Sequence, residues 1–315
     1  MEDILLAESR LENINAVEPI LSALRTVSHG TWQKARVKRA AVQDYRRRIQ
    51  WMTTTLLSSW PDGRRFQAKK QVSGGPNVLI LALGSERGLC GQFNPAAIGM
   101  LQKVSADLPL KKKNARIWAV GSRFIRLVSR DGFKPEWSTS FPGGALPPFS
   151  MALDLTNRIL DAYEKGAVDE VIVVYNQGSR TGRLAARSVR LIPPDPAGVF
   201  QADEQAVHQS TRGGYQSAEK VSSSSQSWPP PIIETDPVQL LGRLVEHTLT
   251  IQMYEFLLAS VAAENATRFF LMEEATQNVD RLIDELEVMV QLDRQQKITQ
   301  EMGELAAGSG LIKVD

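Results

Sequence analysis

A long apolar stripe near the C-terminal end of the chain most constrains its fold. When the chain is read in alternating steps of three and four residues from Leu241, eleven of fifteen positions are apolar and none is proline. This spacing is typical of a coiled-coil helix, and fifteen such positions span roughly 75 Å. A small domain cannot bury so long a helix, so the sequence predicts an elongated molecule. The positions are Leu241, Leu244, Thr248, Ile251, Glu255, Leu258, Ala262, Asn265, Phe269, Met272, Thr276, Val279, Ile283, Leu286 and Val290.

The N-terminal residues supply a partner for this stripe. Their helical spacing ends where Pro61 and the following Asp-Gly favour a turn. Two long helices at opposite ends of a chain can pair antiparallel, which predicts a coiled coil with the intervening domain at one end. The alternative is two separate amphipathic helices that pack on a central domain. The predicted N-terminal positions are Ile4, Ala7, Leu11, Ile14, Val17, Leu21, Leu24 and Val27, then Trp32, Ala35, Val42, Ile49, Met52 and Leu56.

The middle of the chain alternates between short apolar runs and helical patterns. Such alternation predicts βαβ units, and hence an α/β, Rossmann-like domain with a mostly parallel sheet. The predicted strands are 78–83, 116–120, 171–175 and, less regular, 185–192, and the predicted helices are 95–108, 122–130 and 151–165.

The domain boundaries follow from these patterns. Residues 1–60 form the first long helix, 77–195 the α/β domain and 237–310 the last helix. Between them, 196–236 is rich in Pro, Gly and Ser and predicts a flexible loop. Asp236 and Pro237 then suit the N-cap and first turn of the last helix.

Composition excludes several functional classes. The 315 residues carry a net charge of +2, which implies no strong field for nucleic acid or membranes. The single cysteine, Cys90, cannot form an internal disulfide and suits a reducing compartment. The acidic start has no apolar signal core, and no run of about 18 apolar residues could span a membrane. Any membrane association is therefore expected through a partner.

Motifs for catalysis are missing from the sequence. No Gly-Lys-Ser or Gly-Lys-Thr follows a glycine loop, and the three histidines are far apart. The segment 84–91 follows the first predicted strand, where a phosphate-binding turn would lie, but it lacks G-x-G-x-x-G spacing and Glu86 would repel phosphate. We interpret its glycines as structural, and expect no cofactor, metal or catalytic residue.

Three ordered segments make the chain similar to a known family. GSERGLCGQFN after the first strand resembles the S-[DE]-R-G-L-C-G-x-x-N motif of the F-type ATP synthase gamma subunit. ASVAAENATRFFLMEEATQNVDRLIDEL and DRQQKITQEMGELAAGSG resemble that family's last helix. The N-terminal SRLENINAVEPILSALRTVS matches more loosely.

This resemblance implies a function. In the family, the paired terminal helices form a rotating shaft inside a ring of alpha and beta catalytic subunits, and the α/β domain is a foot near the membrane c-ring. Ion flow turns the shaft, which drives the ring through successive states. The resemblance implies a non-catalytic subunit with the epsilon subunit as a further partner. It also implies a peripheral position at the cytoplasmic face of the inner membrane.

The resemblance also assigns residues. Arg294, Gln295, Thr299 and Glu301 match family residues that face loops of the catalytic ring, and Arg268 lies in a matching A-x-R-[MF] segment. The basic run that includes Lys34, Arg36, Lys38 and Arg39 would face acidic loops of the ring, whereas the alternative for all these residues is a solvated helix face. Folding and packing roles fall to Gly88, Leu89, Cys90 and Gly91.

Departures from the family pattern leave alternatives open. Pro19 lies inside the first helix, where it can produce a kink, the segment 196–235 is long, and the last five residues include charges. These features suggest a divergent branch, such as a second, sodium-coupled or hydrolysis-linked ATPase. Two other classes are a Rossmann-like enzyme, which would bind nucleotide, and an unrelated coiled-coil adaptor, which would not associate with a catalytic ring.

Overall fold

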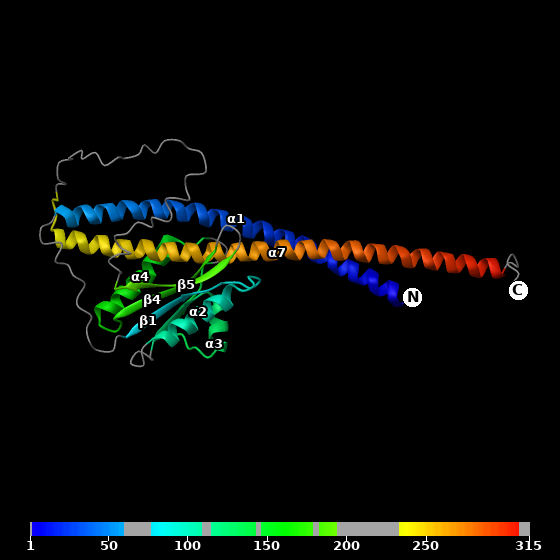
Figure 1. Ribbon diagram of the computed structural model, residues 1–315, viewed down its shortest axis with the longest axis horizontal. Helices are drawn as coiled ribbons and strands as arrows, with labels where there is room; N and C mark the ends of the chain where they lie inside the picture. The colour runs from blue at the N-terminus through cyan, green and yellow to red at the C-terminus, as the bar shows by residue number, and fades with distance from the viewer. Residues whose placement is uncertain are drawn as a thin grey trace, which may run out of the picture.

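Two long antiparallel helices form the shaft of the molecule (Figure 1). The computed structural model describes residues 2–59, 77–108, 115–142, 146–178, 183–193 and 233–308. Helix α1 spans Glu2–Ser59 and α7 spans Pro237–Gly308, which at the α-helical rise correspond to lengths of about 87 Å and about 108 Å. The predicted coiled coil is confirmed. Nearly all of the predicted 196–236 loop, and the charged residues at 311–315, lie outside the described residues.

Ion pairs between the two helices show their register. As residue numbers rise along α1, the partners on α7 fall, as expected for antiparallel helices, and the pairs extend over most of the length of α1. These pairs are Glu8–Arg294 at 2.7 Å, Arg25–Glu273 at 2.9 Å and Arg46–Glu255 at 3.1 Å.

The predicted stripe on α7 is confirmed, because none of its fifteen positions is exposed. The predicted stripe on α1 is wrong at three positions, which are exposed: Val17 (45%), Val27 (62%) and Met52 (48%). At two of them the contact face continues instead through a polar neighbour, Ser28 or Thr53, which is 2% or 3% exposed. Steps of three and four residues along α1 lead from Leu24 to Ser28 and from Ile49 to Thr53. A search for apolar residues at about this spacing picks Val27 and Met52 instead.

The α/β domain between the two long helices in the sequence, here called the foot, contains one five-stranded sheet of order β3-β2-β1-β4-β5. The first four strands in this order are parallel, and β5 runs antiparallel to β4. This confirms the predicted mostly parallel α/β fold. The strands are β1 (Val78–Leu83), β2 (Arg116–Val120), β3 (Trp137–Thr139), β4 (Glu170–Gly178) and β5 (Leu184–Ile192).

Three further helices cover the sheet: α2 (Phe93–Asp107), α3 (Ser122–Arg130) and α4 (Phe149–Glu164). Among the described residues of the foot, the sequence predicted every element except β3, which has three residues and no apolar run. The predicted bounds of β1, β2 and α3 are confirmed, and those of α2, α4 and β5 differ by one or two residues. Strand β4 begins one residue before and ends three residues after the predicted 171–175.

Helix α7 lies between α1 and the sheet (Figure 1). Together with α4 it packs on one face of the sheet, while α2 and α3 pack on the other. Because α7 is enclosed on both sides, almost every residue over 248–266 is buried. Small residues allow this close approach: a Cβ at Gly178 would lie 3.3 Å from the Cα of Ala263.

Pro19 lies inside α1 and does not end it. Helix α1 continues through this residue, and the proline ring is exposed on its surface. The exposed position places the ring away from the contact with α7.

Candidate functional site

A buried arginine joins the foot to the shaft. Arg268 of α7 is 8% exposed, and its guanidinium donates to the carbonyl oxygen of Gly88 in the loop after β1, with Nε–O and Nη2–O distances of 3.3 and 3.2 Å. It also donates to Glu264 (2.6 Å) and Asn265 (3.2 Å). The structure therefore uses Arg268 inside the chain, and this correction removes it from the exposed residues that could face a partner.

Glu264 was not among the predicted site residues. Burial raises the pKa of its carboxyl group, and the charge and hydrogen bond of Arg268 act in the opposite direction. The i, i+4 spacing of Glu264 and Arg268 was a visible signal for this pair. What the sequence could not show is that the pair is buried and faces the loop after β1.

Side-chain hydrogen bonds fix the loop after β1. The amide of Ser85 donates to Asn94 Oδ1 (3.0 Å), and Asn94 Nδ2 donates to Ser85 Oγ (2.7 Å), which itself donates to the carbonyl of Arg87 (2.8 Å). Cys90 is 4% exposed and packs beside this network. Burial raises the pKa of its thiol, which is the behaviour of a packed cysteine and not of a reactive one.

Glu86 connects the same loop to the start of α3. Its carboxylate accepts hydrogen bonds from the hydroxyl and amide of Ser122 and from the amide of Phe141 (2.9 Å). Burial alone would raise the pKa of Glu86, but the hydrogen bonds from Ser122 and Phe141 outweigh it, and the pKa is lowered. From the sequence, the charge of Glu86 was expected to repel phosphate. In the structure, the Glu86 carboxylate connects the loop to Ser122 and Phe141 through hydrogen bonds.

Close packing explains two glycines at this place. A Cβ on Gly84 would lie 1.9 Å from Phe124, and one on Gly121, whose φ is +107°, would lie 2.6 Å from the carbonyl oxygen of Ser85. These contacts favour the structural interpretation of the loop over a phosphate-binding turn.

Leu89 differs from its neighbours. Its φ is 57°, in the left-handed region, and its side chain is 60% exposed. A packing role is therefore wrong for Leu89. Gly91, with a φ of +49°, and Gly88, whose carbonyl binds Arg268, retain roles in the path of the backbone.

The C-terminal part of α7 (residues 294–306), at the end of the shaft far from the foot, is called the upper shaft, and it presents exposed side chains. Arg294 donates to Glu8 of α1 at 2.7 Å, although its side chain is 65% exposed. Gln295 and Glu301 are exposed, and the exposed Thr299 bonds through its hydroxyl to the carbonyl of Gln295. These four predicted residues share one stretch of helix.

The basic run of α1 lies at a different level of the shaft. Trp32 packs against Phe269 with ring centroids 5.9 Å apart, which places the run beside Arg268 and the foot. The distance along the shaft from there to Arg294 is about 40 Å, so the structure does not bring the two predicted surfaces together. Lys34, Arg36 and Lys38 are exposed and Arg39 is half-buried.

Two other kinds of site are absent from the described residues. No group of three or more His, Cys, Asp or Glu side chains there could hold a metal ion. No helix in the same ranges is long and apolar enough to cross a membrane.

Comparisons with known proteins agree with this architecture. A model of the ATP synthase family matches residues 6–310. The ATP synthase gamma chain of Bacteroides thetaiotaomicron is 27% identical over 96% of this chain and 97% of its own, and that of a Cyanothece species is 28% identical over 99% and 100%. Among solved structures, a chain of the Euglena gracilis mitochondrial ATP synthase (OSCP/F1/c-ring) has a TM-score of 0.62 at 16% identity, and covers 98% of this chain and 94% of that one.

A two-helix shaft with a Rossmann-like foot defines the class of ATP synthase central-stalk subunits. A chain in a structure of the Tetrahymena thermophila central stalk and c-ring has the same fold, with a TM-score of 0.54 at 16% identity over 81% of this chain and 99% of that one. The family match extends over nearly the whole chain. The chain belongs to the ATP synthase gamma-chain family.

Proposed function

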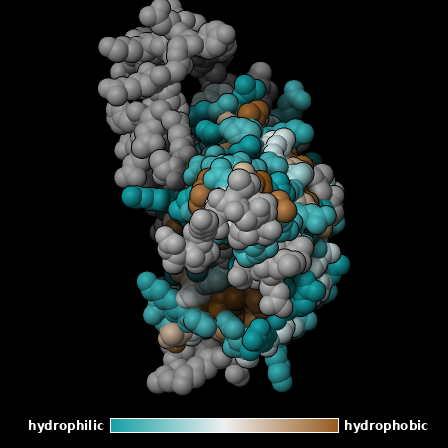
Figure 2. Space-filling model, turned by 90° about the vertical axis from the view of Figure 1, so that its right-hand side faces the viewer, coloured by the Kyte–Doolittle hydropathy of each residue, from teal (hydrophilic) through white to brown (hydrophobic). Residues whose placement is uncertain are grey.

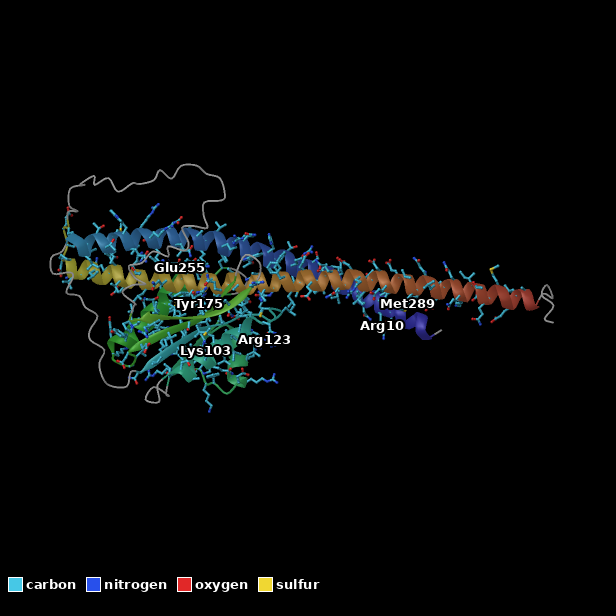
Figure 3. The ribbon with its side chains drawn as sticks, in the orientation of Figure 1. Arg10, Lys103, Arg123, Tyr175, Glu255 and Met289 are labelled. Atoms are coloured by element: carbon cyan, nitrogen blue, oxygen red, sulfur yellow. The ribbon has the colours of Figure 1, made fainter. Side chains whose placement is uncertain are left out.

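We propose that this chain is the torque-bearing shaft of a rotary F-type ATPase and has no catalytic site of its own. The observation that carries the proposal is the geometry of the rod: α7 continues past the first residues of α1, beyond the level of the Glu8–Arg294 pair (Figure 3). A rod that is fixed to a foot at one end and free at the other can transmit rotation to surrounding subunits.

The upper shaft is the proposed contact with the alpha and beta subunits. Arg294, Gln295, Thr299 and Glu301 present polar groups there, and a planar guanidinium suits a carboxylate of a partner loop. The same stretch exposes Ile298 (57%), Met302 (66%) and Leu305 (72%). Exposed apolar groups in a row favour enclosure by a surrounding surface.

The basic run provides a second proposed contact with the ring. Lys34, Arg36 and Lys38 are exposed beside the foot, where a charge-complementary surface would carry acidic loops. Arg36 also lies over the ring of Trp32, with its Cζ 5.8 Å from the centroid, which fixes its position on the helix.

The opposite end of the shaft is the proposed attachment to the c-ring and the epsilon subunit. A shallow apolar groove lies there between the end of α1 and the start of α7, lined by Trp51, Met52, Leu56, Ile233, Leu240 and Leu244 among others. This attachment would hold the protein peripherally, at the cytoplasmic face of the inner membrane.

The first experiment tests the rotor role in the assembled complex. The change Arg294→Ala with Gln295→Ala should lower ATPase turnover per assembled complex several-fold and leave assembly intact, because both side chains are exposed. The control is Arg281→Ala with Gln277→Ala, which removes the same two residue types lower on α7. Equal turnover in the test variant and wild type would contradict the proposed contact.

A second experiment tests the absence of a catalytic site. The isolated chain should bind no ATP at millimolar concentration in a calorimeter. One-to-one saturable binding would instead favour a Rossmann-like enzyme, the alternative that the sequence left open.

A further inference from the structure

The outer face of the foot carries a row of arginines with no assigned role. Helix α3 is nine residues long and contains Arg123, Arg126 and Arg130 but no acidic residue. At 100° per residue the three positions fall within an arc of about 60°, and all three are exposed. Arg123 lies on the side of the sheet away from the two shaft helices (Figure 3).

The foot holds this row rigidly. On the opposite side of α3, Phe124 and Val128 are 0% exposed and pack against the sheet. Glu86 binds both the amide and the hydroxyl of Ser122 at the start of the helix. The arginines therefore project from a fixed platform.

The three arginines differ from several others in the chain that are paired with a carboxylate. Arg25, Arg46, Arg268 and Arg294 each form an ion pair, whereas no ion pair links the α3 arginines to any described residue. Arg123 also lies in the first turn of α3, where the helix dipole disfavours a positive charge. Arg130 lies in the last turn, where the dipole favours a positive charge. The row as a whole therefore presents three exposed, solvated guanidinium groups that a carboxylate of another chain can reach.

We propose that the arginine row of α3 (Arg123, Arg126 and Arg130) is a docking surface for an acidic protein segment of another subunit. Arginine suits this role because its planar fork pairs with carboxylates in two parallel hydrogen bonds. The spacing fits carboxylates on a facing helix or loop. Figure 2 views the molecule along the shaft and shows that hydrophilic residues cover much of the foot surface that is not grey.

An anionic membrane is a poorer fit for this row. A helix that lies on a membrane needs a free apolar face to insert among the lipids. In α3 that face is already used, because Phe124 and Val128 are buried in the foot. The row therefore offers charge without insertion, which favours a protein partner.

Peptide binding by the full-length chain tests this proposal independently of the rotor role. The probe is a fluorescein-labelled, alanine-rich helical peptide with glutamates spaced to match the three arginines. Vesicles of phosphatidylglycerol serve as the competing surface. The test variant is Arg123→Glu with Arg126→Glu, and the control, Arg187→Glu with Arg243→Glu, makes the same charge change at exposed positions elsewhere.

The expected result is selective loss of peptide binding. At low salt, the α3 variant should bind the peptide at least about tenfold more weakly than wild type, and the control less than about twofold. Equal losses in both variants would show a mere net-charge effect and overturn the proposal. Binding of wild type to the vesicles but not to the peptide would overturn it as well.

Cross-linking in the assembled complex provides the second measurement. A photo-reactive amino acid at Ser129, an exposed position on α3, should cross-link to a carboxylate-rich segment of another subunit. Cross-links to lipid alone, or to no other subunit, would overturn the proposal.

Discussion

Arg268 of α7 donates two hydrogen bonds to the carbonyl oxygen of Gly88, 180 residues earlier in the chain. The same guanidinium pairs with Glu264 at 2.6 Å, and both side chains are at most 10% exposed. This contact connects the loop after β1 to the shaft by polar interactions, in addition to the apolar packing of α7 on the sheet.

Removal of this arginine should destabilise the protein strongly. Arg268→Ala leaves the carboxyl group of Glu264 buried without its partner, which costs about 3 kcal/mol or more in the free energy of unfolding. Urea denaturation of the full chain measures this loss. The control is Arg281→Ala, which removes an exposed i, i+4 partner of Glu285 and should cost under about 0.5 kcal/mol. Similar losses in the two variants would contradict the role of Arg268.

The stability of the part of α7 that is buried between α1 and the sheet should depend on side-chain volume. Leu258 is 0% exposed where α7 lies between α1 and the sheet, whereas Leu282 is 41% exposed farther up the same helix. Leu258→Ala should therefore lower the free energy of unfolding by about 2–5 kcal/mol, and Leu282→Ala by under about 0.5 kcal/mol. Thermal and urea unfolding of both variants check the difference. An equal effect would mean that α7 is not packed as described.

An ion pair between α1 and α7, in the buried part of their contact, should specify the register of the two helices. Arg46 and Glu255 meet at 3.1 Å, with side chains 20% and 7% exposed. Glu255→Arg places two arginines together and should cost about 3 kcal/mol, while the double change Arg46→Glu with Glu255→Arg should recover at least about half of that loss. Unfolding of wild type, the single variants Arg46→Glu and Glu255→Arg, and the double variant forms a double-mutant cycle that gives the coupling energy of the pair.

A surface pair controls for the general effect of charge reversal. Arg116 and Glu136 are 3.6 Å apart and roughly half exposed, so reversal of Glu136 should change stability by under about 1 kcal/mol. If the double change Arg46→Glu with Glu255→Arg recovers no stability, Arg46 and Glu255 do not specify the register.

Periodicity in the sequence predicted the architecture but not the polar contacts. The α7 stripe was visible because buried positions recur every three or four residues, and β1 because a central parallel strand is apolar throughout. The α1 stripe failed at Val27, since an apolar residue and its polar neighbour compete for the same turn. The short strand β3 has too few residues for a periodic pattern.

The site residues show the limit of sequence reasoning more clearly. The residues at the upper shaft were named through family resemblance, and their contacts remain a prediction. Arg268 was placed among partner contacts because its motif matched, yet its donors turn inward to Gly88 and Glu264. Long-range pairs of this kind depend on how elements distant in sequence approach one another, which no local pattern encodes.

The acid stability of the foot should depend on Glu86. Its pKa is lowered in the folded protein because hydrogen bonds from Ser122 and Phe141 outweigh the effect of burial. A carboxyl group with a lowered folded pKa contributes stability above its unfolded pKa, about 4.3 for glutamate, and loses that contribution as the pH falls through the folded value. Glu86→Gln should therefore be less stable than wild type at pH 7, and the difference should shrink as the pH falls below about 4. Urea unfolding from pH 7 to 3 measures this difference, with Glu136→Gln, an exposed carboxyl group, as the control. A difference that is independent of pH would show that the neutral side chain, and not the ionised carboxylate, holds the start of α3.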